Sequence, residues 1–268
     1  MVDACKASAS RLGVEQIPLY QIHFPDIIQP FKAFGLEKRK DETVCSPEFE
    51  LGALPFPDYH SLPGFDLSFV QYWDGLAQCF EQGLAANVGV CNYGPSMVEK
   101  VHAYLAERGI PLASNQINFS LMYRKEAEAT IAKCNELGVP VISYFPLANG
   151  LLAGRYDADN LPKFPKSLTM KKYVMGDGSD AYPEGGYTPL LDALRRIAAK
   201  RGKTVPQVSI NWVLCKGAIP IPGARDGAMS EANMGAMGWR LTPEEVKELE
   251  QASDAVGFEF SSGGFKLE

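Results

Sequence analysis

The sequence has no excess of positive charge and no long apolar run. Its 268 residues include 26 Lys and Arg against 32 Asp and Glu, which gives a formal net charge of −6. This balance argues against a nucleic-acid partner, because nucleic-acid-binding proteins usually present a basic face. Every apolar run falls short of the roughly 18 residues that a membrane-spanning helix requires. We therefore expect neither a nucleic acid nor a membrane as a partner.

Potential metal ligands and paired cysteines are also scarce. The three histidines lie far apart, and no carboxylate or thiolate stands at ligand spacing from them, which gives no support to a metal site. The six cysteines contain no C-x-x-C pair, and most lie inside apolar patterns. We expect them to be reduced, buried thiols of an intracellular soluble protein. The N-terminus does not decide between plastid and cytoplasm.

The sequence does contain a regular alternation of short apolar runs and helix-like stretches, which predicts a parallel sheet covered by helices. A polar residue stands at the C-terminal end of each of five runs. In parallel barrels the chemistry lies at this end of the strands, because the loops between strand and helix open there. The five runs span residues 17–23, 88–92, 112–116, 139–144 and 218–225.

The number of units is smaller than a closed barrel requires. A (β/α)8 TIM barrel has eight strand–helix units, whereas we find about five. We therefore expect an α/β fold of this barrel type that is incomplete, as a single domain over residues 1–268 that is N-terminally truncated. Residues 24–70 break the alternation, because they are rich in proline and aromatic residues. A long segment after the first strand predicts a packed, lid-like insertion over the barrel mouth.

Four strand-end residues have side chains that suit a carbonyl substrate and a flat ring. His23 can donate a hydrogen bond to a substrate carbonyl or act as an acid. Asn92 and Gln116 offer both a donor and an acceptor, which matches a carboxamide ligand, and Tyr144 can stack on a flat ring. Structural roles remain open for each: a core histidine, amides that tie loops together, and an aromatic residue that closes the core.

An anion site is predicted where the last strand ends. The segment Ile221–Arg225 combines a glycine turn with a fixed cation, and a helix begins near Gly227. A helix N-terminus beside an arginine suits a phosphate group. The chain contains neither G-x-x-x-x-G-K-[ST] nor G-x-G-x-x-G, which excludes a P-loop and a Rossmann turn. An ordinary turn with a solvated arginine is the alternative.

Several strings together resemble the aldo-keto reductase family. They resemble its C-terminal portion and are closest to the plastid-type reductases of plants and algae. The fold implied is the (β/α)8 barrel without its first three strands. The strings are QIH, VGVCNYGP, ASNQINFSL, VISYFPLANGLLAG, TVPQVSINWVL and IPIPGARDGAMSEANMGAMGWRLTPEEV.

The resemblance implies roles for the strand-end residues in binding NADPH and the substrate. His23 corresponds to the active-site histidine that orients the substrate carbonyl. Asn92 and Gln116 correspond to the residues that hold the nicotinamide carboxamide, and Tyr144 to the residue that stacks on the nicotinamide ring. Cys91 stands where the family usually has serine, which weakens one contact to the carboxamide.

The resemblance also places the rest of the cofactor. Gly150 and Leu151 lie in the loop that passes the pyrophosphate. Arg225 would contact the adenosine 2′-phosphate and favour NADPH over NADH, while Asn233 would lie near the adenine. Asp226 would repel that phosphate unless it caps the next helix.

The implied activity is NADPH-dependent, reversible reduction of an aldehyde or ketone. The family protonates the alcohol oxygen with a tyrosine activated by a lysine and an aspartate, all from the first three strands. We expect a chain without these strands to be an impaired reductase, because a positioned general acid contributes about 10²–10⁴-fold to a rate. The alternative is a catalytically inactive nucleotide-sensing or partner-binding protein on the same scaffold. The two open barrel edges, 17–23 and 219–221, would favour self-association.

Overall fold

The structure is a computed structural model that describes residues 1–23, 67–156 and 187–256. The chain divides into two compact units. The first comprises Met1–Val90 and Val101–Leu112, and the second Cys91–Lys100 and Ala113–Glu268. Within the described ranges, every helix is too short or too polar to cross a membrane.

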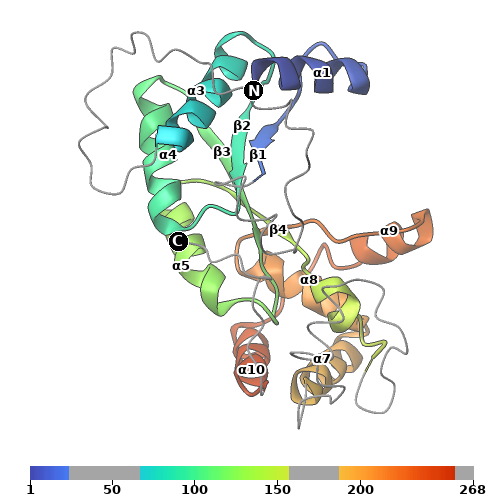
Figure 1. Cartoon of the computed structure of the whole chain (residues 1–268). Helices are drawn as coiled ribbons and strands as arrows, with labels where there is room; N and C mark the ends of the chain where they lie inside the picture. The colour runs from blue at the N-terminus through green and yellow to red at the C-terminus, as the bar shows by residue number, and fades with distance from the viewer. Residues whose placement is uncertain (24–66, 157–186, 257–268) are drawn as a thin grey trace, which may run out of the picture. The chain divides into compact units, whose positions relative to one another are not determined.

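The first unit contains a parallel strand pair and the helices that pack beside it (Figure 1). Tyr20 of β1 lies opposite Val88 of β2 in this pair. Gly13 has a φ of 68° and ends the first helix, since glycine adopts this left-handed conformation without strain. The elements are α1 (Val2–Leu12), β1 (Tyr20–Ile22), α3 (Leu67–Glu81), β2 (Val88–Cys91) and the later part of α4 (Pro95–Glu107).

Helix α3 corrects one boundary of the sequence prediction. Residues 67–70, which the prediction assigns to the lid, form the first turn of this helix. Trp73, Leu76 and Ala77 are buried at helical spacing, and burial of this face stabilises a helix. The rest of the predicted lid lies outside the described residues.

The second unit continues the alternation of parallel strands and helices. Asn118 of β3 lies opposite Tyr144 of β4, and Ile142 of β4 lies opposite Ile219 of β5. Its elements are the start of α4, β3 (Leu112–Asn118), α5 (Lys125–Glu136), β4 (Val141–Tyr144), η2 (Ala148–Ala153), α7 (Thr188–Arg201), α8 (Val205–Cys215), β5 (Ile219–Pro220), α9 (Gly227–Met234) and α10 (Pro243–Asp254).

In the first unit β1 pairs with β2, in the second β3 pairs with β4 and β4 with β5, and all three pairs are parallel. Five strands paired in this way are consistent with part of an eight-stranded barrel. Self-association through the two end strands stays a prediction. The 3₁₀ helix η2 was not predicted from the sequence, because its Gly-rich string has no helical period.

Local signals in the sequence begin the last helices. Thr242 and Glu245 form a capping box at the start of α10, and Thr204 and Gln207 form another at α8. In each box the two residues satisfy backbone N–H groups that the first helical turn leaves without partners. These signals are local, which is why the sequence predicts where α10 begins.

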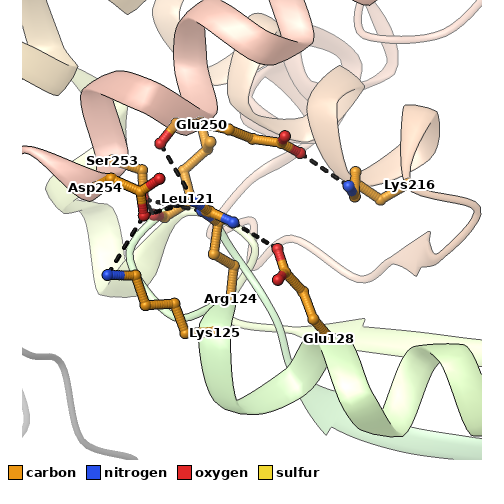
Figure 2. Close-up of polar contacts among 8 residues, drawn as sticks. All are labelled: Leu121, Arg124, Lys125, Glu128, Lys216, Glu250, Ser253 and Asp254. Carbon is orange, nitrogen blue, oxygen red and sulfur yellow. Dashed lines mark hydrogen bonds and ion pairs between the residues drawn. The ribbon is translucent and has the colours of Figure 1, made fainter.

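Ion pairs hold α10 against α5 and α8 (Figure 2). Arg124, only 9% exposed, pairs with Glu128 in α5 and at 2.6 Å with Asp254 at the end of α10. Lys216, directly after α8, pairs with Glu250 of α10 at 2.8 Å. The carboxylates of α10 therefore fix this helix to two helices that lie far apart in sequence.

Candidate active site

Strained backbone gathers at the carboxyl ends of β2 and β4. Among the described residues other than glycine, those with positive φ are Asn92 (62°), Phe145 (52°), Ala148 (46°) and Asn149 (55°). Asn92 directly follows β2, and the other three lie in the five residues after β4. Residues other than glycine rarely adopt this backbone conformation, and those that do concentrate at active sites and ligand clamps. The second unit therefore has a candidate site at this edge of its sheet.

Asn92 lies at the centre of this edge and is 6% exposed. Its backbone N–H donates to the carbonyl oxygen of Gln116 in β3 at 2.8 Å. Its side-chain oxygen accepts a hydrogen bond of 2.7 Å from the hydroxyl of Tyr144. Its side-chain nitrogen donates to Cys91 Sγ at 3.3 Å. The structure thus brings together three residues of the predicted cofactor site, Asn92, Gln116 and Tyr144.

Cys91 is a neutral thiol at the end of β2. Burial raises its pKa to about 12, although the backbone of Asn92 opposes this shift. A thiolate is therefore absent at neutral pH, and sulfur in this form is only a weak hydrogen-bond acceptor. A buried thiol thus faces the amide of Asn92, and the weaker contact to a carboxamide at this position stays a prediction.

Tyr144 is the last residue of β4 and is supported by its neighbour. The ring of Phe145 meets the Tyr144 ring edge to face, with centroids 5.1 Å apart. Phe145 itself is 46% exposed and has a positive φ of 52°. Sequence reasoning missed Phe145, because nothing in the string SYFP signals a positive φ.

Asn115 and Gln116 differ although they are adjacent. Asn115 is fully buried, and its amide nitrogen donates to the carbonyl oxygen of Tyr93 at 2.8 Å. It therefore ties the loop after β2 to β3, which is the structural alternative that the sequence leaves open for amides at strand ends. Gln116 is the next residue of β3, so its side chain points to the opposite face of the strand, and it is only half-buried.

The loop after β4 holds the two residues that the resemblance assigns to the pyrophosphate. Gly150 has a φ of 96° and donates its N–H to Leu147 O at 2.8 Å. Leu151 is 1% exposed, so its side chain anchors the loop while its backbone forms part of η2. Each can contact a ligand only through the backbone.

Arg225 and Asp226 lie between β5 and α9, and both side chains are exposed. Asp226 is the N-cap of α9, where its carboxylate accepts from Met229 N at 2.7 Å. Because Asp226 caps the helix, its carboxylate is engaged with the backbone, which is the arrangement that would leave room for a phosphate beside Arg225. Asn233 lies in the last turn of α9 and is half-buried.

His23 belongs to the first unit and directly follows β1, where its side chain is exposed. His23 therefore stands at the end of a strand, and its role at a substrate carbonyl stays a prediction. Across the described residues, no group of three His, Cys, Asp or Glu could hold a metal ion. The five described cysteines are free thiols, of which four are buried and Cys215 is half-buried.

The fold and this edge define an α/β protein of the parallel-barrel class, with its polar and strained residues where barrel enzymes carry their chemistry. The chain belongs to the aldo/keto reductase family, whose model matches residues 1–254.

Curated relatives agree with this membership. The chain is 39% identical to the chloroplastic pyridoxal reductase of Arabidopsis thaliana over 253 residues, which cover 94% of this chain and 57% of the relative. It is 27% identical to the protein REDOX 2 of Catharanthus roseus, covering 97% of this chain and 64% of the relative. The chain thus spans about three fifths of the length of these relatives.

Solved structures are similar in fold. The glycerol dehydrogenase of Gluconobacter oxydans matches with a TM-score of 0.69 at 23% identity, over 97% of this chain and 65% of that one. An aldo-keto reductase of Bombyx mori in complex with NADP matches with a TM-score of 0.60 at 22% identity, over 94% and 62%. These likenesses show the shared fold.

Proposed function

We propose that this chain carries the NADPH-binding side of an oxidoreductase that interconverts an aldehyde or ketone and its alcohol. The observation that carries the proposal is the hydrogen bond from Tyr144 to Asn92, a residue with positive φ, at the carboxyl edge of the sheet. Family membership supports the cofactor, and the name of the plant relative supports an aldehyde such as pyridoxal as substrate.

The residues at this edge fit a nicotinamide carboxamide. An amide that is mostly buried and already oriented needs little reordering to bind a second amide. The Asn92 nitrogen faces the Cys91 sulfur at 3.3 Å, and a carboxamide oxygen is a stronger acceptor than that sulfur. Tyr144 supplies an aromatic face for the ring, and Gln116 a further amide.

Other residues would bind the remaining groups. Arg225 is exposed beside a capped helix start and would pair with the 2′-phosphate. The backbone at Gly150 and Leu151 would pass the pyrophosphate, and Asn233 would lie near the adenine. NADPH, when bound, supplies the hydride, so that a carbonyl, NADPH and a proton give the alcohol and NADP. His23 would donate a hydrogen bond to the carbonyl oxygen and polarise it.

The first experiment measures NADPH binding and NADPH oxidation separately. Binding is followed by fluorescence titration, and turnover by loss of NADPH absorbance with pyridoxal or 4-nitrobenzaldehyde. We expect saturable binding that Asn92→Ala weakens about tenfold or more, because a buried hydrogen-bonding amide is lost. Asn135→Ala, which changes an exposed asparagine of α5, is the matched control. Absence of NADPH binding by the wild-type chain would overturn the proposal.

A second candidate is a protein that binds the nucleotide without turnover, as a sensor or a partner-binding scaffold. It is favoured by the observation that the residues proposed to bind the cofactor all belong to the second unit, where Tyr144 and Asn92 are hydrogen-bonded to each other. Saturable NADPH binding without oxidation by any carbonyl compound would support it. Turnover that depends on His23 would exclude it.

A further inference from the structure

The amide of Asn92 is held in one orientation by two side chains. Its oxygen accepts from the Tyr144 hydroxyl at 2.7 Å, and its nitrogen donates to Cys91 Sγ at 3.3 Å. An asparagine amide can exchange the positions of its oxygen and nitrogen at little cost when its neighbours do not distinguish them. Here the neighbours favour the observed orientation, because it pairs the phenolic O–H with the amide oxygen, a good acceptor, and leaves the NH2 to the weakly accepting sulfur.

This orientation decides what Asn92 offers to a ligand. The oxygen is directed to Tyr144, and the NH2 is the group that donates to an acceptor. One hydrogen of this NH2 is directed to a neutral thiol, since burial raises the Cys91 pKa to about 12, and such a sulfur competes only weakly. The NH2 can therefore exchange this sulfur for a stronger acceptor of a ligand, such as a carbonyl oxygen.

We infer that Tyr144 is a positioning residue whose hydroxyl fixes the Asn92 amide so that it donates to the carbonyl oxygen of the nicotinamide carboxamide. This role rests on the proposed function and is distinct from ring stacking, because it needs only the hydroxyl. Phe145, packed edge to face at 5.1 Å, holds the Tyr144 ring from the side. The strained φ of 62° at Asn92 fixes the backbone from which the amide extends.

The test removes the hydroxyl alone, with Tyr144→Phe, and compares three cofactors by fluorescence titration. Loss of one buried hydrogen bond should weaken NADPH binding about five- to tenfold. The 3-acetylpyridine analogue of the phosphorylated cofactor keeps the carbonyl oxygen but has a methyl group in place of the NH2. It should show the same loss. The thionicotinamide analogue should show a smaller loss, because sulfur is a weaker acceptor than oxygen.

Tyr187→Phe is the matched control. The Tyr187 hydroxyl is buried and donates to Tyr156 O, also at 2.7 Å, but its partner is a backbone oxygen and not a residue of the site. This variant should bind all three cofactors within about twofold of the wild type. Comparison of its melting temperature with that of Tyr144→Phe separates general destabilisation from lost positioning.

Each other outcome is informative. If the loss disappears with the acetylpyridine analogue, Asn92 accepts from the carboxamide NH2 and the inference is wrong. Unchanged binding of all three cofactors by Tyr144→Phe also overturns it and leaves the proposed function intact. In an Asn92→Ala background, Tyr144→Phe should add no further loss, whereas an additive loss would mean that the hydroxyl acts independently of Asn92. Failure of the wild type to bind any of the three would overturn the proposed function as well.

Discussion

Three buried asparagines of the second unit differ in what their amides contact. Asn115 and Asn211 donate to backbone carbonyl oxygens and thereby fix loops. Asn92 instead contacts the side chains of Tyr144 and Cys91. A side-chain partner can move aside or be exchanged for a ligand more easily than a backbone carbonyl, which suits Asn92 to binding and the other two to structure.

Asn211 provides a prediction at this scale. Its nitrogen donates to Ala236 O and Trp239 O at 2.8 and 2.9 Å, and its oxygen accepts from Leu241 N at 3.0 Å. Asn211→Ala leaves these buried groups without partners, and should lower the free energy of unfolding by about 3 kcal/mol. Urea unfolding measures this. Asn135→Ala should change stability by less than about 0.5 kcal/mol, and an equal effect of both variants would contradict the assigned role.

Among the elements, α10 forms ion pairs with residues at the start of α5, in α7 and in the turn after α8. Besides the contacts of its C-terminal half in Figure 2, its first turn pairs with α7. Glu245, with a side chain only 4% exposed, pairs with Arg201. Hydrogen bonds from Arg201 lower the Glu245 pKa to about 2, although burial opposes this. One residue therefore serves both the capping box of α10 and the packing of α10 on α7.

The depressed pKa predicts acid sensitivity. The folded chain favours the ionised form of Glu245, because Arg201 donates hydrogen bonds to it. The stabilisation from this contact is therefore fully present above the ordinary pKa of 4.5 and is lost as the pH falls towards 2. The loss should amount to about 2–3 kcal/mol. Glu245→Gln keeps the cap and should be less stable than the wild type at pH 7, with the difference vanishing near pH 2. Chemical unfolding at several pH values measures this.

The matched control is Glu248→Gln on the same helix. Glu248 pairs with Arg196, and both side chains are largely exposed, at 42% and 65%. Exposed pairs contribute about 0–1 kcal/mol, because water and salt screen them. If Glu248→Gln destabilised the protein as much as Glu245→Gln, the ion pair of α10 with Arg201 would not be the cause.

At the scale of the whole molecule, cofactor binding should appear as stabilisation. A ligand that binds only the folded chain raises stability by RT ln(1 + [L]/Kd), so the melting temperature should rise with NADPH concentration and less with NADH. Arg225→Ala should reduce the NADPH effect to that of NADH, because Arg225 is proposed to bind the phosphate that distinguishes them. Lys203→Ala, on the turn after α7, is a control. An unchanged NADPH effect in Arg225→Ala would contradict the assignment.

Much of the element order follows from local patterns. The strand ends, the cap at Gly13 and the capping box of Thr242 depend on neighbours within a few residues, so the sequence predicts them well. Strand lengths are less well predicted. The run 218–225 forms a strand only over Ile219–Pro220, because strand length depends on pairing with β4. Helix α9 ends at Met234, and the Ala236 carbonyl oxygen two residues later accepts from Asn211.

The sequence by itself determined the class of fold, the family and the residues that stand at the strand ends, because period, turn residues and motif strings are written in consecutive positions. The tertiary structure decided which of these residues meet. The bond from Tyr144 to Asn92 joins positions 52 apart, the positive φ values of Phe145 and Ala148 depend on their surroundings, and Asn115 became structural through its bond to Tyr93. Such contacts depend on the packing of distant strands, which no local pattern encodes.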